Sequence, residues 1–461
     1  MQQRDITILG GGFSGSMLAV QLAHLRQPLA GTVHIVEPRP VLGAGLAYLD
    51  RRPEHLLNVR TVNLSAFPDQ PSHFAAWLEA TGAATCEHDY CPRQTYGRYM
   101  QALTAAILAA PAANGLTFRW HQQAALGVEV ATDGCQATVR LADGTEIRSD
   151  TVVLALGNFP PPSPAGPGAY LAHPGFHGNP WAAGALRGIG PDDEVLLIGS
   201  GLTAVDVLLG LRADGHRAPV TVVSRHQRCP VSHQLPAAPY PDFYETRLRG
   251  LGTVGEVLAV VRHQVRQAAA QGIPWRYVFD SLRPHLGAIW AAWPLAEQAR
   301  FLRHLASLWS VLRHRSPPQN EAAVRGMMAT GQVRMRAGRV HGLEAAGESL
   351  RVRIGQGGQT DLLTVRHVIN CTGPLLDYTR IQDPMVMGLR AAGHLQTDPL
   401  RLGILTDEHG ALLDAAGRTS RLLFTLGPSR RPAYFESTAV PELRQQAVAL
   451  AQELGCRWRG L

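Results

Sequence analysis

The chain has 461 residues, too many for one small core, so two or three lobes are expected. Its apolar fraction of 45% and its charged fraction of 17% are those of a globular protein and exclude a disordered one. The net charge is +7, but the basic residues form no run of the kind that marks a nucleic-acid arm. No nucleic-acid partner is therefore expected.

The chain contains no lysine, and all 43 basic residues are arginine. This composition excludes a Schiff-base lysine, a pyridoxal phosphate enzyme and a phosphate loop of the GxxxxGK[ST] type. No apolar run is long enough for a membrane span, and no signal peptide opens the chain. A cytoplasmic protein without a membrane partner is expected.

The six cysteines include no CxxC pair, which argues against a disulfide-reductase flavoenzyme with a dithiol beside its flavin. Cys86, His88 and Cys91 have the side chains of metal ligands, but no second pair follows at zinc spacing. Ordinary thiols are the preferred interpretation, and no metal site is predicted.

A first nucleotide site is predicted near the N-terminus. An apolar run over residues 5–9 meets a glycine turn over 10–15, and helical spacing follows over 16–24. Strand, glycine turn and helix form the context in which GxGxxG binds a dinucleotide, with the pyrophosphate at the helix N-terminus. The predicted contacts in this turn are Gly10, Gly12, Phe13, Ser14 and Gly15.

The next predicted strand, over 32–36, ends in Glu37. An acid at this place accepts hydrogen bonds from the ribose of an adenosine, and a turn that binds nothing would leave it unexplained. Arg39 and Gly45 follow in a loop suited to a long ligand such as FAD. Asn58 either continues this wall or has a structural role alone.

A second nucleotide site is predicted where a strand over 194–198 meets another glycine turn and helix. Here an alanine takes the third glycine position, which the fingerprint allows. The following strand, over 220–224, ends in serine and arginine, which favours the 2′-phosphate of NADPH, although NADH remains possible and the arginine is otherwise solvated. The predicted contacts are Gly199, Gly201, Thr203, Ala204, Ser224 and Arg225.

Two short motifs predict where the chain passes between lobes. Residues 151–158 follow a predicted β-meander over 128–147, and residues 368–374 follow a second one over 333–363. Each is a strand that ends in small residues, where backbone approaches a nucleotide or flavin. The predicted contacts are Ala155, Gly157, Thr372 and Gly373.

These elements predict an α/β fold with two Rossmann-like domains, in which the NAD(P)-type domain is inserted into a discontinuous FAD domain. The expected boundaries are 1–165 for the first part of the FAD domain, 166–330 for the NAD(P) domain with a helical segment, and 331–461 for the second part of the FAD domain. The helical segment spans 254–315 and is either a substrate lid, with arginines that bind a carboxylate, or an amphipathic layer. His233 is equally compatible with a structural or a catalytic role.

The glycine turns and joints together resemble flavoproteins with two dinucleotide-binding domains, including flavin-containing and N-hydroxylating monooxygenases. The chain more closely resembles the bacterial FAD/NAD(P)-binding protein family. The stretches that carry this resemblance are 43–48, 65–68, 96–99, 312–315 and 436–444.

The resemblance implies that the C-terminal segment completes the flavin site, through Gly427, Thr438 and Ala439. A helix capped by Ser437 or Thr438, with Pro441 in its first turn, would point its N-terminus at the flavin. The alternative is an ordinary C-terminal helix with a serine cap. Two departures bear on catalysis: Asn158 stands where many flavin monooxygenases have histidine, and Pro428 where related flavoproteins often have aspartate.

The resemblance implies a class of enzyme, but no catalytic residue is predicted. The leading hypothesis is an NADPH-dependent flavin monooxygenase that takes a small amine or amino acid and O₂ as substrates. An NAD(P)H:acceptor reductase or dehydrogenase and a non-catalytic FAD-binding sensor are the alternatives. The substrate, the oligomeric state and the choice of NADPH or NADH stay open.

Overall fold

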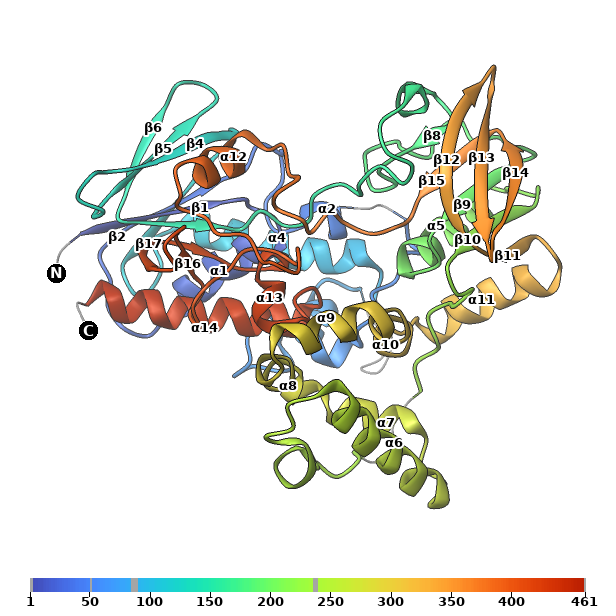
Figure 1. The fold of residues 1–461 in the computed structure, drawn as a ribbon. Helices are drawn as coiled ribbons and strands as arrows, with labels where there is room; N and C mark the ends of the chain where they lie inside the picture. The colour runs from blue at the N-terminus through green and yellow to red at the C-terminus, as the bar shows by residue number, and fades with distance from the viewer. Residues whose placement is uncertain (1–2, 50–51, 84–89, 235–238, 460–461) are drawn as a thin grey trace.

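The computed structural model describes residues 3–49, 52–83, 90–234 and 239–459. Two lobes, each built on a parallel sheet, stand side by side, and a group of helices lies beneath them (Figure 1). Within the described residues, no helix combines the length and the apolar character that crossing a membrane requires.

The first lobe contains a six-stranded sheet in the order β16-β17-β7-β1-β2-β3. All neighbouring strands are parallel except β16 and β17, which come from the C-terminal part of the chain. The first lobe is therefore discontinuous in sequence, as predicted. Its strands are β1 (Arg4–Leu9), β2 (Gly31–Val36), β3 (Leu116–His121), β7 (Thr151–Leu154), β16 (Ala411–Leu413) and β17 (Thr419–Thr425).

Alternating side chains of the first sheet face two different layers, because successive residues of a strand point to opposite faces. Ile6 and Ile8 pack against helices, whereas Leu9 packs against an antiparallel sheet and a short helix. The helical layer contains α1 (Phe13–His24), α2 (Gly45–Tyr48), α3 (His73–Ala80), α4 (Arg93–Ala109) and α14 (Val440–Trp458). The other layer contains β4 (Ala125–Val130), β5 (Ala137–Leu141), β6 (Glu146–Ser149) and α12 (Pro384–Ala391).

The second lobe contains a five-stranded, all-parallel sheet in the order β11-β10-β9-β15-β8. The same alternation applies: Leu197 faces two helices, whereas Leu196 faces a three-stranded antiparallel sheet. The strands are β8 (Phe176–His177), β9 (Val195–Ile198), β10 (Val220–Ser224), β11 (Val333–Ala337) and β15 (His367–Asn370). The flanking elements are α5 (Leu202–Ala213), α11 (Pro318–Ala329), β12 (Arg339–Ala346), β13 (Ser349–Gln356) and β14 (Gln359–Val365).

One prediction about this lobe is wrong: β11 does not belong to an antiparallel meander. It pairs in parallel with β10, and only β12, β13 and β14 form the meander. An alternating apolar pattern has the same period in parallel and antiparallel strands, so it does not identify the partner strand.

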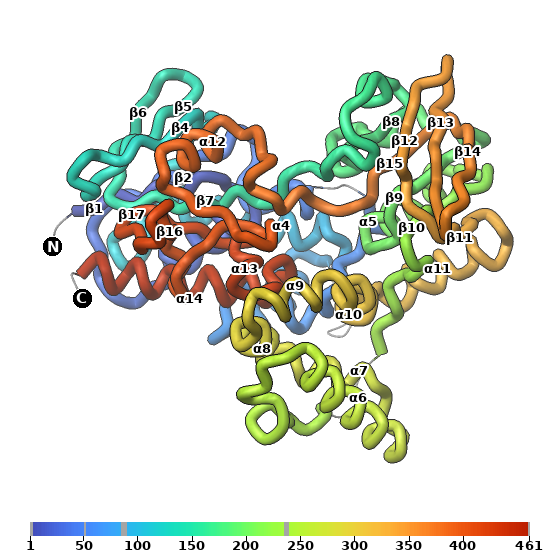
Figure 2. The backbone as a smooth tube through the Cα atoms, in the orientation of Figure 1, coloured from blue at the N-terminus to red at the C-terminus, as the bar shows by residue number. Residues whose placement is uncertain are grey.

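Two extended segments join the lobes and run side by side in opposite directions (Figure 2). They meet in an antiparallel bridge between Phe159 and Leu375. Because β11 and β15 both lie in the second sheet, the predicted domain boundary at residue 330 divides this sheet. We therefore propose that the inserted domain extends from residue 166 to the end of β15, at Asn370.

The predicted helical stretch over 254–315 is a group of five helices with a core of its own (Figure 1). Trp290 from this group stacks on Phe435 at 4.8 Å between ring centroids, which attaches it to the C-terminal segment. The helices are α6 (Val254–Ala270), α7 (Trp275–Ser281), α8 (Leu286–Ala292), α9 (Leu295–His304) and α10 (Ala306–Arg313). The group contacts the first lobe through α8 and α13 (Arg431–Tyr434).

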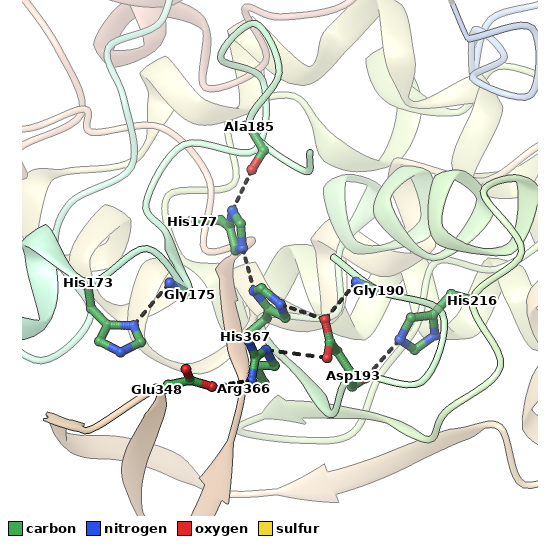
Figure 3. A network of polar contacts seen from close by, with 10 residues as sticks. All are labelled: His173, Gly175, His177, Ala185, Gly190, Asp193, His216, Glu348, Arg366 and His367. Carbon is green, nitrogen blue, oxygen red and sulfur yellow. Dashed lines mark hydrogen bonds and ion pairs between the residues drawn. The ribbon is translucent and has the colours of Figure 1, made fainter. Parts of the chain in front are cut away.

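A series of hydrogen-bonded side chains connects the edge strand β8 of the second sheet to its neighbour β15 (Figure 3). His177 Nε2 lies 3.1 Å from His367 Nδ1, and His367 Nε2 lies 3.1 Å from Asp193 Oδ2. His367 is the first residue of β15, whereas the glycine turn at Gly199 follows the carboxyl end of β9. Because parallel sheets bind ligands at the carboxyl ends of their strands, this histidine chain has a structural role.

Candidate functional site

The two outer glycines of the first turn are required by the fold itself. Gly10 has a φ of +107°, and a Cβ atom there would lie 2.4 Å from the carbonyl oxygen of Ala155. A Cβ atom at Gly15 would lie 1.9 Å from the carbonyl oxygen of Gly10. Both glycines therefore allow the turn, the first helix and the end of β7 to pack closely.

The middle glycine of the turn has a different environment. Gly12 has a φ of −69°, which any residue adopts. The nearest atoms to a Cβ there would be Gly45 Cα at 3.4 Å and Arg39 Nη2 at 3.5 Å. Gly12 lines a cavity of about 500 Å³, so a side chain there would occupy ligand space rather than core.

This first cavity brings together most of the residues predicted for FAD. It extends from the glycine turn past the ends of β2 and β7 to the segment that precedes α14. The predicted residues that line it are Gly10, Gly12, Phe13, Ser14, Glu37, Arg39, Gly45, Ala155, Gly157 and Thr438.

Glu37 is an ionised, buried acid at the end of β2, with 2% of its surface exposed. Burial acts to raise the pKa of Glu37, but the hydrogen bonds and charge of Arg39 and the Gly11 N–H group outweigh it, so the pKa is lowered. The Arg39 guanidinium donates to both carboxylate oxygens at 2.8 Å, and the Gly11 N–H group donates at 3.0 Å. The acid is thus held as an acceptor at the mouth of the glycine turn.

The second glycine turn repeats the geometry of the first. Gly199 also has a φ of +107°, and a Cβ there would lie 2.4 Å from the carbonyl oxygen of Cys371. Gly201 has a φ of −78° and nothing within 4 Å of a Cβ position, whereas Ala204 is buried in the core of the second lobe. In the second turn, as in the first, the first glycine is crowded by backbone atoms, whereas the middle glycine is not.

At the end of β10, Ser224 and Arg225 are placed differently from each other. The Ser224 hydroxyl is buried and has no hydrogen-bond partner among the described residues, and the Arg225 side chain is exposed. Neither lines one of the cavities described here. Their role at a 2′-phosphate stays a prediction.

A second cavity, of about 220 Å³, lies between the lobes. Thr203 and Gly373, both predicted, line it together with Asn158, which also lines the first cavity. The two cavities therefore adjoin at the first joint between the lobes. Thr372 does not line it: its hydroxyl donates to Asn370 Oδ1 at 2.7 Å.

Sequence reasoning missed three residues of this second cavity: Arg93, Trp181 and Asp206. Arg93 belongs to the first lobe and donates to Asp206 of the second at 2.8 Å, and it lies over the Trp181 ring at 5.2 Å. No local motif signals such a contact, because its members lie 113 residues apart. Asp383, the N-cap of α12, and Met385 in its first turn also line the first cavity and were missed for the same reason.

The C-terminal segment differs from its prediction in its cap. α14 begins at Val440 with Ala439 as its N-cap, and neither Ser437 nor Thr438 caps it. The Ser437 hydroxyl instead donates to the carbonyl oxygen of Gly427 at 2.5 Å and accepts from Gln446 at 2.8 Å. The predicted Pro441 does lie in the first turn.

Gly427 supports the cavity without lining it. It has a φ of +94°, and a Cβ atom there would lie 2.9 Å from the Ser14 hydroxyl. Pro428, the next residue, lines the first cavity.

A third cavity, of about 290 Å³, begins where the first one ends. Ala439 lines it and is adjacent in sequence to Thr438, which lines the first cavity. Asn58, predicted as a wall residue, lines this third cavity rather than the first, and His233 lines it too. The N-terminus of α14 therefore lies between the first and third cavities.

The cysteines show no sign of a dithiol site in the part of the chain that the structure describes. Cys91 and Cys371 are buried, and burial raises the pKa of Cys91 to about 11. Cys86 and His88, from the cluster considered as metal ligands, lie outside the described residues. None of the described cysteines lines the first, second or third cavity.

Comparison with known proteins agrees with this geometry. Residues 7–159 match the model of a family described as FAD-NAD(P)-binding. No curated protein sequence matches the chain.

Solved structures match over nearly the whole chain. An ornithine N-hydroxylase of Kutzneria sp. 744, solved with reduced FAD, NADP⁺ and L-ornithine, has a TM-score of 0.67 at 14% identity, with 99% of this chain and 100% of that chain covered. The L-lysine 6-monooxygenase of Pseudomonas syringae has a TM-score of 0.67 at 16% identity, with 98% of this chain and 99% of that chain covered. The bacillithiol disulfide reductase of Staphylococcus aureus has a TM-score of 0.54 at 13% identity, with 99% of each chain covered.

At these identities the likeness shows the fold, and the fold is the one predicted: two Rossmann-like units with a helical segment. Residues 7–159 thus match the FAD-NAD(P)-binding family model, and the whole chain shares its fold with the ornithine and lysine hydroxylases.

Proposed function

We propose that the protein is an NADPH-dependent FAD monooxygenase that hydroxylates a small amine. The observation that carries the proposal is the arrangement of the three cavities. The first glycine turn lines the first cavity, Leu202 and Thr203 just after the second turn line the adjoining second cavity, and a third cavity begins at the end of the first. This arrangement supplies separate places for FAD, a nicotinamide nucleotide and a substrate.

The first cavity fits FAD in its size and in its donors and acceptors. The open position at Gly12 leaves space for a pyrophosphate at the N-terminus of α1, whose first-turn N–H groups have no side-chain cap. Glu37 accepts ribose hydroxyls, and Arg39 adds positive charge beside the pyrophosphate. FAD bound there would accept a hydride from NADPH and pass electrons to O₂.

The protein's own contribution to this chemistry would be to position the two nucleotides and to stabilise negative charge on the reduced flavin ring. The N-terminus of α14 lies where the first cavity ends, so its dipole favours negative charge on the reduced ring. Asn158 stands at the boundary of the first and second cavities, where a nicotinamide would meet that ring. The second turn, through Gly201 and Thr203, would hold the pyrophosphate of NADPH.

The alternative is a reductase, which the likeness to a bacillithiol disulfide reductase favours. The monooxygenase is preferred because the two hydroxylases match with higher TM-scores, and because no described cysteine lines the three cavities.

The oxygen half-reaction tests the proposal. The FAD-loaded protein is reduced by NADPH under argon and mixed with oxygenated buffer in a stopped-flow spectrometer. We expect an absorbance transient that differs from both oxidised and reduced flavin and decays faster when an amine substrate is present. Immediate reoxidation with release of peroxide and no transient would indicate the reductase instead.

A further inference from the structure

The third cavity has an unusual concentration of guanidinium groups. It lies where residues 58–63 of the first lobe meet α7 and the N-terminus of α14. Its charged lining consists of Arg60, Arg283 and Arg313, with Asp280 as the one carboxylate. Among the described residues, positive groups thus outnumber negative ones on its wall.

The ion pairs around the cavity leave part of this positive charge uncompensated. Arg283 and Arg313 share a single carboxylate, that of Glu442, at 3.3 and 2.7 Å. Asp280 is already paired with Arg315 at 2.9 Å.

The Arg60 side chain has no hydrogen-bond or ion-pair partner among the described residues. Four guanidinium groups, those of residues 60, 283, 313 and 315, therefore face three carboxylates, those of Asp280, Glu442 and Glu436, the last of which acts on Arg313 through its charge. One positive charge remains to be balanced by an anion.

An unsatisfied donor points to the same place. The Arg313 side chain is 8% exposed, and its Nε atom is buried without a hydrogen-bond partner in the part of the chain that the structure describes. An unmade hydrogen bond from a buried, charged group is costly, and native proteins rarely leave one.

Titration behaviour in the cavity is consistent with a positive field. Burial and then the charge of Arg315 lower the pKa of His233 to about 4, and Arg283 acts in the same direction. The His233 Nε2–H group donates to the Asn58 carbonyl oxygen at 2.9 Å. Because its pKa is lowered to about 4, this side chain is neutral at pH 7. Burial and the charge of Arg283 also lower the pKa of Arg313.

We propose that the third cavity is an anion site that binds the carboxylate groups of a negatively charged amine substrate. The inference rests on the proposed function, because that function is what makes the cavity a substrate site. Arginine pairs with carboxylates through two parallel hydrogen bonds, which gives both affinity and orientation. A substrate with a cationic chain, such as a diamine, would meet repulsion here.

The position of the bound carboxylates follows from the ion pairs around the cavity. Arg283 and Arg313 both pair with Glu442 in the first turn of α14, so carboxylates that they bind would lie next to the N-terminus of that helix.

Calorimetric titration of the FAD-loaded protein tests the site without turnover. The probes are glutarate, inorganic phosphate and cadaverine, in the absence of NADPH. We expect glutarate to bind at least tenfold more tightly than phosphate and cadaverine to produce no binding heat. Equal affinity for glutarate and cadaverine, or for glutarate and phosphate, would overturn the carboxylate assignment.

Arg60→Gln and Arg283→Gln are the informative variants, since Arg60 has no described partner and Glu442 keeps Arg313 when Arg283 is lost. Each should weaken glutarate binding at least fivefold while FAD content and circular dichroism stay unchanged. Arg266→Gln, an exposed position on α6, is the matched control and should bind glutarate like the unmodified protein. Unchanged affinity in both cavity variants would overturn the proposal.

The outcome separates this inference from the proposed function. A protein that binds glutarate but is not reduced by NADPH would refute the monooxygenase and leave the anion site standing. A protein that NADPH reduces but glutarate does not bind would refute the anion site alone.

Discussion

Gly10, Gly12 and Gly15 are one motif in sequence but have different constraints in the structure. The first and last are fixed by backbone atoms within 2.4 Å of a Cβ position, whereas a Cβ at the middle one would meet atoms only at 3.4 Å and beyond, at the wall of the first cavity. Substitutions at the three positions should therefore fail for different reasons. The same holds for Gly199 and Gly201 in the second turn.

Gly12→Ala should fold normally and lose FAD, because its φ of −69° suits alanine and the new methyl group occupies the cavity. The measurement is flavin released per protein after purification, alongside the thermal midpoint. Gly201→Ala is the matched control: it should keep FAD and weaken NADPH binding instead. Full FAD occupancy in Gly12→Ala would contradict the placement of the pyrophosphate.

Arg225→Ala should raise the KM for NADPH about tenfold or more and leave the KM for NADH nearly unchanged. The reason is that a guanidinium–phosphate contact is charge-assisted, and only NADPH carries the 2′-phosphate. Steady-state oxidation of both nucleotides measures the difference. Equal changes in both KM values would remove Arg225 from the 2′-phosphate site.

His233 should make the protein less stable in acid. Its pKa is about 4 in the folded protein and about 6.5 when unfolded, so the unfolded chain binds the proton first. Its stabilising contribution is therefore present above pH 6.5 and is lost as the pH falls towards 4.

Urea unfolding at pH 7 and pH 4.5 measures this loss in the protein and in His233→Gln. The variant should lose roughly 2–3 kcal/mol less between the two pH values, which is the size of the pKa difference expressed as free energy. Parallel losses in both proteins would show that His233 titrates normally.

At the level of elements, the sequence was enough to predict features formed by neighbouring residues, but not contacts between distant segments of the chain. Strand, turn and helix around both glycine turns are adjacent in sequence, so their patterns were sufficient. The acid Glu37 was found because it ends the next strand. The lobe contact between Arg93 and Asp206, and the contribution of α12 to the first cavity, depend on chain segments that only the tertiary fold brings together.

The same limit explains the errors at β11 and α14. An alternating strand pattern does not identify its neighbour, so β11 was placed in the wrong sheet. Two hydroxyl residues before Pro441 suggested a cap, but Ser437 is drawn into hydrogen bonds with Gly427 and Gln446. Tertiary hydrogen bonds decided the cap, and no local pattern reports them.

The attachment of the helical group to α14 depends on buried charge. Glu436 is 8% exposed, accepts from Trp309 Nε1 at 2.7 Å and pairs with His314 at 3.0 Å. Burial acts to raise the pKa of Glu436. The charge and hydrogen bond of His314, together with the charge of Arg313, outweigh burial, so the pKa of Glu436 is lowered.

Glu436→Gln should therefore cost roughly 2–4 kcal/mol of stability, since it leaves buried cationic partners without their anion. Chemical denaturation measures this cost. Glu245→Gln is the control, because its ion pair with Arg249 is exposed and should contribute less than about 1 kcal/mol. Similar small losses in both variants would show that the helical group does not depend on this contact.

At the scale of the whole molecule, the two lobes are held in one orientation by side chains that cross between them. Arg93 bonds to Asp206, and Arg52 pairs with Asp214 at 2.6 Å. Both acids belong to α5 or its C-cap, so the second glycine turn is fixed relative to the first lobe. The cavities adjoin because of this orientation, and electron transfer between two bound nucleotides requires it.

Anaerobic reduction of the FAD-loaded protein tests whether both turns bind nucleotides and act together. We expect rapid loss of the oxidised flavin absorbance with NADPH, slower loss with NADH, and a defect in Gly201→Ala that raised NADPH concentration relieves. Flavin that stays oxidised with both nucleotides would show that the two turns do not act together and would leave the protein as a flavin-binding module without this activity.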